Sequence, residues 1–175
     1  MITFYDNILC YEDKNSSPRK VHWMDISTRG LKPLQDSNVT HTSLPNLVDM
    51  ICVVSATKRV LLACSEKSLE VYDAKADKIM WIAEGILPGM KNEIRATSIA
   101  TDEEFVYVTD HTNACMHVFE FEGTYKGFVP SQGEEGYPCH VTYDKTRKSM
   151  SVLYVREGGS VGICRMVRWG PSHIM

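Results

Sequence analysis

Short apolar runs with strand character alternate with polar or glycine-bearing turns along most of the chain. No capped segment shows the 3.6-residue period of an amphipathic helix. The runs are rich in β-branched and aromatic residues, which is typical of strands joined in hairpins. We therefore expect an all-β, antiparallel chain with almost no helix. The clearest runs form pairs across one turn: 60–64 with 69–73, 106–110 with 117–121, and 152–155 with 161–165.

The paired runs recur at a nearly fixed distance. Val71, Val118 and Ile163 occupy equivalent places, 47 and 45 residues apart, and Trp23 lies 48 residues before Val71. Most units also open with one strand-like run and close with another, so each holds about four short strands. Four strands at this spacing are typical of β-propeller blades. An antiparallel sandwich or barrel is the alternative, but the fixed period favours the propeller.

The repeat predicts an arc of about three to four four-stranded blades. The first unit is expected to begin at its second strand, near Ile8, and the last to lack a clear fourth strand after Val167. The chain then either closes a small ring through its termini or is a segment of a longer protein, which we favour. Open blade faces favour self-association. The expected blades are 1–35 (incomplete), 48–84, 94–130 and 137–169, and the expected open faces carry Val106, Val108, Val118 and Val152.

One blade resembles an NHL repeat. Residues 106–113 read Val-Tyr-Val-Thr-Asp-His-Thr-Asn, followed by Val118-Phe119 and an acidic-Gly turn at 122–123. Residues 137–144 are similar to that family's blade opening. The family's usual basic residue before Val-Phe is absent, and Ser68–Asp73 is closer to a WD-repeat strand. The resemblance covers roughly residues 50–168 and is closest to the NHL propellers of tripartite-motif-type proteins.

Composition places the chain among ordinary globular domains. It has 175 residues, of which 43% are hydrophobic and 23% charged, with a net charge of −3. A net negative charge gives no sign of the basic surface that a nucleic-acid-binding protein usually carries. No apolar run approaches the roughly 18 residues of a membrane span, and no signal peptide is visible. The six cysteines form no Cys-x-x-Cys pair and mostly lie in apolar runs, so we expect a reduced, cytoplasmic location and no membrane association.

Three features that might carry chemistry favour a structural interpretation. Residues 158–162 match Gly-x-Ser-x-Gly, but strands flank them, whereas a nucleophile elbow needs a following helix. His111, His117 and His140 show no spacing that would make them converge on a metal. Asp110 and Asn113 bracket a turn that Asx side chains commonly stabilise. We therefore expect no catalytic residue, no metal ligand, no cofactor and no enzyme activity.

The loops between blades are the remaining candidates for function, because the sheets are committed to the core. We expect a non-catalytic interaction scaffold that binds a protein partner, as the NHL resemblance implies for propellers that form the recognition end of a longer chain. RNA binding, which some NHL propellers perform, is the first alternative, and a metal-dependent lyase or lactonase is the second. The candidate binding residues lie on one loop face: Lys67, Lys91, Arg95, His111 and Tyr137.

Overall fold

The regular structure of the chain is entirely β in the part that the computed structural model describes. No helix in that part is long and apolar enough to cross a membrane. Side chains are described at residues 68–71, 79–102, 104–131 and 136–156. The backbone is described there and also in the strands at 2–5, 8–13, 20–25, 32–33, 41–43, 50–55, 60–65, 72–73, 78 and 161–166.

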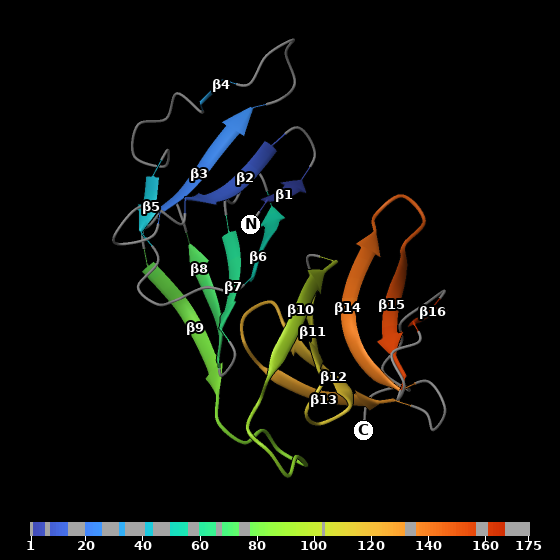
Figure 1. Cartoon of the computed structure of the whole chain (residues 1–175). Coiled ribbons are helices and arrows are strands. Elements are labelled where there is room, and N and C mark those ends of the chain that lie inside the picture. Colours follow the sequence, from blue (N-terminus) through green and yellow to red (C-terminus); the bar gives the residue numbers. More distant parts are fainter. Residues whose placement is uncertain are drawn as a thin grey trace. The chain divides into compact units, whose positions relative to one another are not determined.

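The strands form four antiparallel sheets, each of which largely follows the order of the chain (Figure 1). The first holds β1 (Ile2–Tyr5), β2 (Ile8–Asp13) and β3 (Lys20–Asp25), with β4 (Lys32–Pro33) and β5 (His41–Ser43) both paired to β3. The second holds β6 (Met50–Ser55), β7 (Val60–Ser65), β8 (Ser68–Asp73) and β9 (Lys78–Glu84). The third holds β10 (Ala96–Thr101), β11 (Phe105–Asp110), β12 (Cys115–Glu120) and β13 (Tyr125–Pro130). The fourth holds β14 (Tyr137–Asp144), β15 (Ser149–Val155) and β16 (Val161–Met166).

The first sheet differs from its expected form. β1 pairs with β2 through Ile2 opposite Tyr11 and Tyr5 opposite Ile8, so a strand precedes the one expected to open the unit. At four residues, β1 is too short to show a period in the sequence. A fourth strand after Val167 falls outside the described residues.

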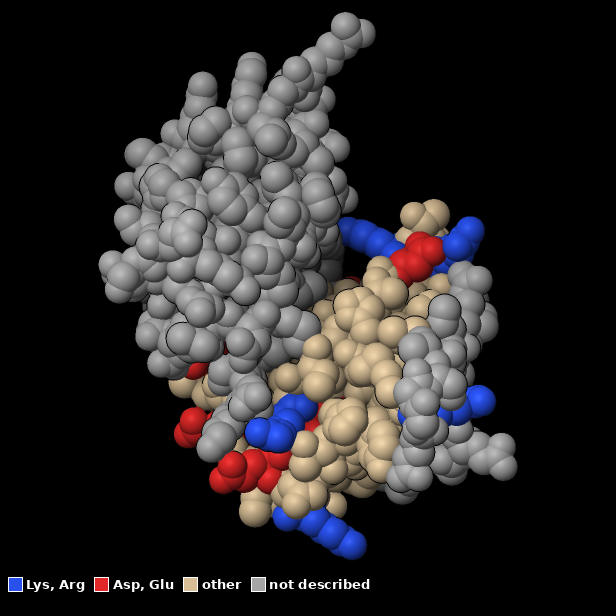
Figure 2. All heavy atoms as spheres, viewed as in Figure 1, with Lys and Arg blue, Asp and Glu red and all other residues tan. Residues whose placement is uncertain are grey.

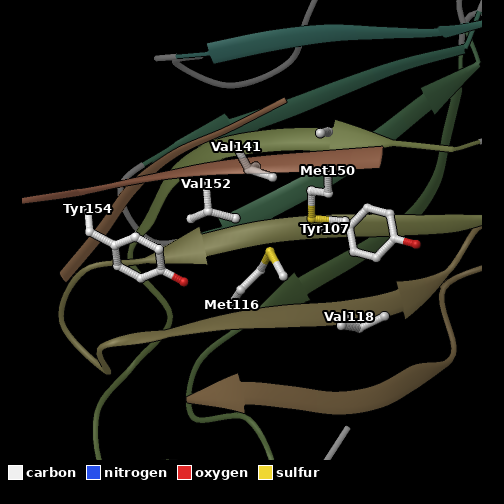
Figure 3. Packing of buried hydrophobic residues seen from close by; sticks show 8 residues of the cluster. Tyr107, Met116, Val118, Val141, Met150, Val152 and Tyr154 are labelled. Atoms are coloured by element: carbon white, nitrogen blue, oxygen red, sulfur yellow. The ribbon is translucent and has the colours of Figure 1, made fainter. Parts of the chain in front are cut away.

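The chain divides into two compact units, Met1–Ser65 with Glu70–Trp81, and Glu66–Leu69 with Ile82–Met175. In the second unit, one face of the β10–β13 sheet packs against the β14–β16 sheet. Their shared cluster of buried side chains is hydrophobic, and such burial is the main stabilising term of a fold. The cluster contains Ala100, Tyr107, Met116 and Val118 from one sheet and Val141, Met150, Val152 and Tyr154 from the other (Figure 3).

The β10–β13 sheet is buried on both faces in its middle strands. Residues 106–110 of β11 and 115–119 of β12 are all buried, without the alternation of a sheet that faces water on one side. The expected exposure of Val106, Val108 and Val118 is therefore wrong, and so is that of Val152, since all four are fully buried. These valines supply no open apolar face for self-association.

The first strands of the third and fourth sheets carry irregularities at equivalent places. The register shifts between Ala96 and Ser98 in β10 and between Pro138 and His140 in β14. Such bulges redirect side chains. Here the buried Ser98 Oγ lies 2.9 Å from Nδ1 of the exposed His140, and hydroxyls of β10 also reach the Pro138 and Val141 carbonyls at 3.4 Å, so polar contacts join the two sheets.

Candidate functional site

Loops from three places in the sequence gather at one end of the β10–β13 sheet. β10 begins after residue 95, β11 ends at Asp110, and β12 begins at Cys115, so the 85–95 connection and the 111–114 turn share that end. Tyr137, at the start of β14, contacts this turn. We call residues 85–95, 111–114 and Tyr137 the loop face. Its longest segment is the connection that follows β9 in Figure 1.

The 85–95 connection is a closed loop with a small core of its own. The Ile94 N–H donates to the Gly85 carbonyl at 2.8 Å, which joins the two ends of the loop. Leu87 and Ile94 are buried, whereas Ile86 is 62% exposed. Compact loops of this Ω type are packed by their own side chains and are frequently functional. The exposure of Ile86 was not predicted from the sequence, because nothing there distinguishes Ile86 from its buried neighbour Leu87.

A buried carboxylate ties the loop face to the sheet. Asp110 is fully buried, and its Oδ2 accepts from His117 Nε2 at 3.0 Å, from Asn113 Nδ2 at 2.9 Å and from the Arg95 N–H at 3.2 Å. Its Oδ1 accepts from the Asn113 N–H at 3.0 Å. Burial alone would raise the pKa of Asp110, but the hydrogen bonds from His117, Asn113 and Arg95 outweigh it and hold that pKa below its ordinary value.

His117 continues this network across the sheet. Its ring is fully buried, with Nε2 on Asp110 and Nδ1 3.1 Å from the Tyr125 hydroxyl. Cys115 Sγ lies 3.6 Å from the same Nε2. Burial and, to a smaller extent, the charge of Asp110 raise the pKa of the Cys115 thiol to about 12.

The Cys115, His117 and Asp110 side chains do not form a nucleophilic triad. Such a triad places the acid and the nucleophile on opposite ring nitrogens, whereas here Cys115 Sγ lies nearer to Nε2, the nitrogen that meets Asp110, than to Nδ1, at 3.6 Å against 3.9 Å. The thiol is also buried, and its raised pKa disfavours the thiolate that a nucleophile needs. These groups therefore brace the structure. Among the described residues, no group of three His, Cys, Asp or Glu side chains is placed to hold a metal ion.

The Asn113 side chain links the 111–114 turn to the 85–95 connection by hydrogen bonds. Its Oδ1 accepts from the Asn92 N–H at 3.2 Å, and its Nδ2 donates to the Asn92 carbonyl at 3.2 Å. Its backbone N–H and its Nδ2 both donate hydrogen bonds to the Asp110 carboxylate. The structural interpretation of the Asp110 and Asn113 pair is thus confirmed, and the pair fixes two loops instead of one.

Replacing Asn113 with alanine should loosen the loop face locally. The Asn92 amide loses its acceptor, and we expect its hydrogen exchange to accelerate about fivefold while global stability falls by about 1 kcal/mol. Exchange measured by NMR or mass spectrometry tests this. Thr112→Ala, an exposed change in the same turn, is the control and should leave Asn92 exchange unchanged. Equal acceleration in both variants would show that the Asn113 side chain does not hold the connection.

Four of the five predicted binding residues lie on the loop face. His111 is exposed and its ring packs against Tyr137 at an interplanar angle of 31°, with centroids 4.6 Å apart. Lys91 and Arg95 are exposed on the 85–95 connection. Lys67 lies outside the described residues. Their binding role stays a prediction.

Acidic and basic side chains are interspersed on the described surface in Figure 2. On the loop face, Glu93 is exposed beside Lys91 and Arg95. This view therefore shows no broad field of one sign, of the kind that attracts nucleic acid.

No protein-family model matches the chain, and no curated protein sequence does. Solved structures match its fold. A chain of the Mitotic Checkpoint Complex has a TM-score of 0.62 at 9% identity over 98% of this chain and 50% of its own. The WD40 domain of Toxoplasma gondii coronin has a TM-score of 0.60 at 10% identity, over 98% and 43%. BamB from Moraxella catarrhalis has a TM-score of 0.57 at 11% identity, over 94% and 42%.

These similarities show the fold of the chain, which is a β-propeller arc, and they favour the propeller over a sandwich or barrel. The chain spans half or less of the length of the three propeller chains. They show no NHL membership and no link to tripartite-motif proteins.

Proposed function

We propose that the chain is a non-catalytic protein-binding scaffold and that the loop face is its binding surface. The observation that carries this proposal is the bracing of the face from within by Asp110 and Asn113. A surface held in one conformation loses less entropy on binding than a mobile one.

The exposed groups of this face suit a protein partner. Arginine and tyrosine are enriched at protein interfaces, and the exposed Arg95 and the partly buried Tyr137 supply them here, beside the exposed His111. Ile86 adds an exposed apolar side chain. One of the similar chains belongs to the Mitotic Checkpoint Complex, which supports a propeller acting within an assembly.

Site-specific photo-crosslinking in cells tests the proposal. A benzophenone amino acid in place of Ile86 should capture a discrete protein, and the same probe in place of Thr124, exposed in the turn between β12 and β13, should not. Adding Arg95→Ala and His111→Ala should reduce the capture from position 86. Capture of the same protein from both positions, or from neither, contradicts the loop face as the binding surface.

The two alternatives have their own outcomes. Single-stranded RNA bound at physiological salt, and released when Lys67, Lys91 and Arg95 are replaced by glutamine, would favour RNA binding. Stoichiometric zinc or calcium in the purified protein would favour the lyase or lactonase hypothesis.

A further inference from the structure

The last strand of the second sheet, β9, presents apolar side chains to solvent along an open edge. Among the described strands only β8 pairs with β9, which stands at the end of the order β6-β7-β8-β9 (Figure 1). Met80 and Ile82 are 41% and 47% exposed, and Glu84 is exposed next to them. Side chains two residues apart share one face of a strand, so these three form one exposed row. Ala83, on the other face, is buried.

The equivalent strand of the third sheet, β13, is protected against pairing with another strand. It contains Gly127 with a φ of 132°, it ends at Pro130, and its register with β12 shifts between Val118 and Phe119. The exposed Lys126 adds a charge inside the strand. Prolines, bulges and lysines block the edge-to-edge association of sheets. The seven residues of β9 include no proline and no glycine, and their charges stand only at the two ends.

The residue order of β9 is complementary to itself when two copies run antiparallel. A twofold axis at Trp81, the middle residue of the strand, would relate two such copies. Lys78 of each copy would then lie opposite Glu84 of the other, and Met80 opposite Ile82. Opposite charges and apolar side chains placed directly across from one another stabilise a pair of strands. The exposed row of one copy would continue in the exposed row of the other.

Other alignments of two β9 strands lose this match. A parallel pair in register would set Lys78 opposite Lys78 and Glu84 opposite Glu84. An antiparallel pair shifted by one residue would join the exposed row of one copy to the opposite face of the other. An axis at Met80 would set Lys78 opposite Ile82, so neither charge would meet its opposite.

We propose that β9 pairs edge to edge with β9 of a second copy of this chain, antiparallel and centred on Trp81, so that two blades join into one continuous sheet. A second copy fits this edge because the strand itself supplies the charges and the apolar side chains that its own edge matches. Seven residues bury less area than a standard interface, so the dimer should form only at raised concentration. The contact is independent of the loop face, which contains no residue of β9.

Sedimentation velocity of the full chain from about 1 to 200 μM tests the pairing, with a monomer–dimer equilibrium as the expected result. Lys78→Glu or Glu84→Lys alone should weaken the dimer about tenfold, because each change creates two pairs of like charges. The two changes together should restore the dimer to within about twofold of the original affinity. Net charge cannot explain this pattern, since the single changes shift it in opposite directions.

Ile82→Lys should weaken the dimer by at least about tenfold, because a charge then faces Met80 twice. Thr142→Lys adds the same charge at an exposed β-branched residue of β14 and should change the affinity less than about twofold. Circular dichroism and thermal unfolding verify that the variants fold.

Three results would overturn the proposal: a monomer at every concentration, no restoration by the double charge exchange, or equal losses from Ile82→Lys and Thr142→Lys. A benzophenone amino acid in place of Met80 identifies the occupant of the edge and should join two copies of the chain. A product with a different protein instead would assign the edge to a foreign strand and contradict the dimer. Failure of the crosslink at Ile86 leaves these measurements untouched, because they probe another surface.

Discussion

Replacing Asp110 with alanine is expected to lower the free energy of unfolding by about 3–5 kcal/mol, because one buried partner is removed from a paired network. The change leaves the buried His117 Nε2, the Arg95 N–H and the Asn113 amides without their shared acceptor. Urea denaturation followed by circular dichroism measures the loss.

Asp144→Ala is the matched control for this change. Asp144 accepts the same turn hydrogen bond, at the same 3.0 Å, but its side chain is 37% exposed and has no buried histidine beside it. We expect a loss of about 1 kcal/mol. If the two alanine variants lose equal stability, Asp110 acts only on its turn and the buried network contributes nothing further.

The Asp110 carboxylate should also make the free energy of unfolding depend on pH in the acidic range. Its hydrogen bonds lower the pKa of Asp110 below the ordinary 3.8, so the ionised group stabilises the folded state fully above about pH 4. That contribution is lost as the pH falls through the lower folded-state pKa. The stability difference between the wild type and Asp110→Asn should therefore shrink between pH 7 and pH 3. A constant difference over this range would show that the charge of Asp110 is not involved.

The repeat predicted the strands because strand character is local. Residues 106–110 alternate with turn residues clearly enough to place β11 without knowledge of its neighbours. The same holds for the Asp110 and Asn113 bond, which spans only three residues. Where the signal was only four residues long, in β1, no pattern distinguished it.

Contacts between strands and sheets lie beyond such local signals. His117 meets Asp110 only through the pairing of β11 with β12, and the sequence did not show that its ring is fully buried. Ser98 meets His140 across 42 positions and two sheets. The placement of His111 and Tyr137 on one face followed from the blade pattern, but the contact between their rings depends on how β14 packs beside the turn.

The expected exposure of the valines was wrong for a related reason. Val106 and Val118 belong to a sheet that is covered on both faces, and a run of apolar residues does not say what covers it. Ile86 shows the converse, since one of two adjacent apolar side chains packs inside its loop and the other does not. Sequence patterns thus predicted the strands and the loop face better than the exposure of particular side chains.

Gly136→Ala should be the most damaging change on the loops, with a loss of about 3 kcal/mol. Gly136 has a φ of +89°, which alanine rarely adopts, and an added Cβ would overlap the Val155 carbonyl oxygen and come within 2.9 Å of Arg156 Cα. Both neighbours are backbone atoms at the end of β15, where Val155 pairs with Tyr137, so they cannot withdraw without breaking the register. Thermal and urea unfolding measure the loss.

Gly85→Ala separates backbone strain from this overlap. Gly85 has a similar φ of +72°, but no described heavy atom lies within 4 Å of the added Cβ. Only the left-handed conformation is penalised there, and we expect a loss of about 1 kcal/mol. The remaining difference of about 2 kcal/mol is the cost of pushing Tyr137 and the end of β15 apart. Equal losses at Gly85 and Gly136 would contradict the close approach of β15 to Gly136. They would also contradict the rigid placement of the neighbouring Tyr137 on the loop face.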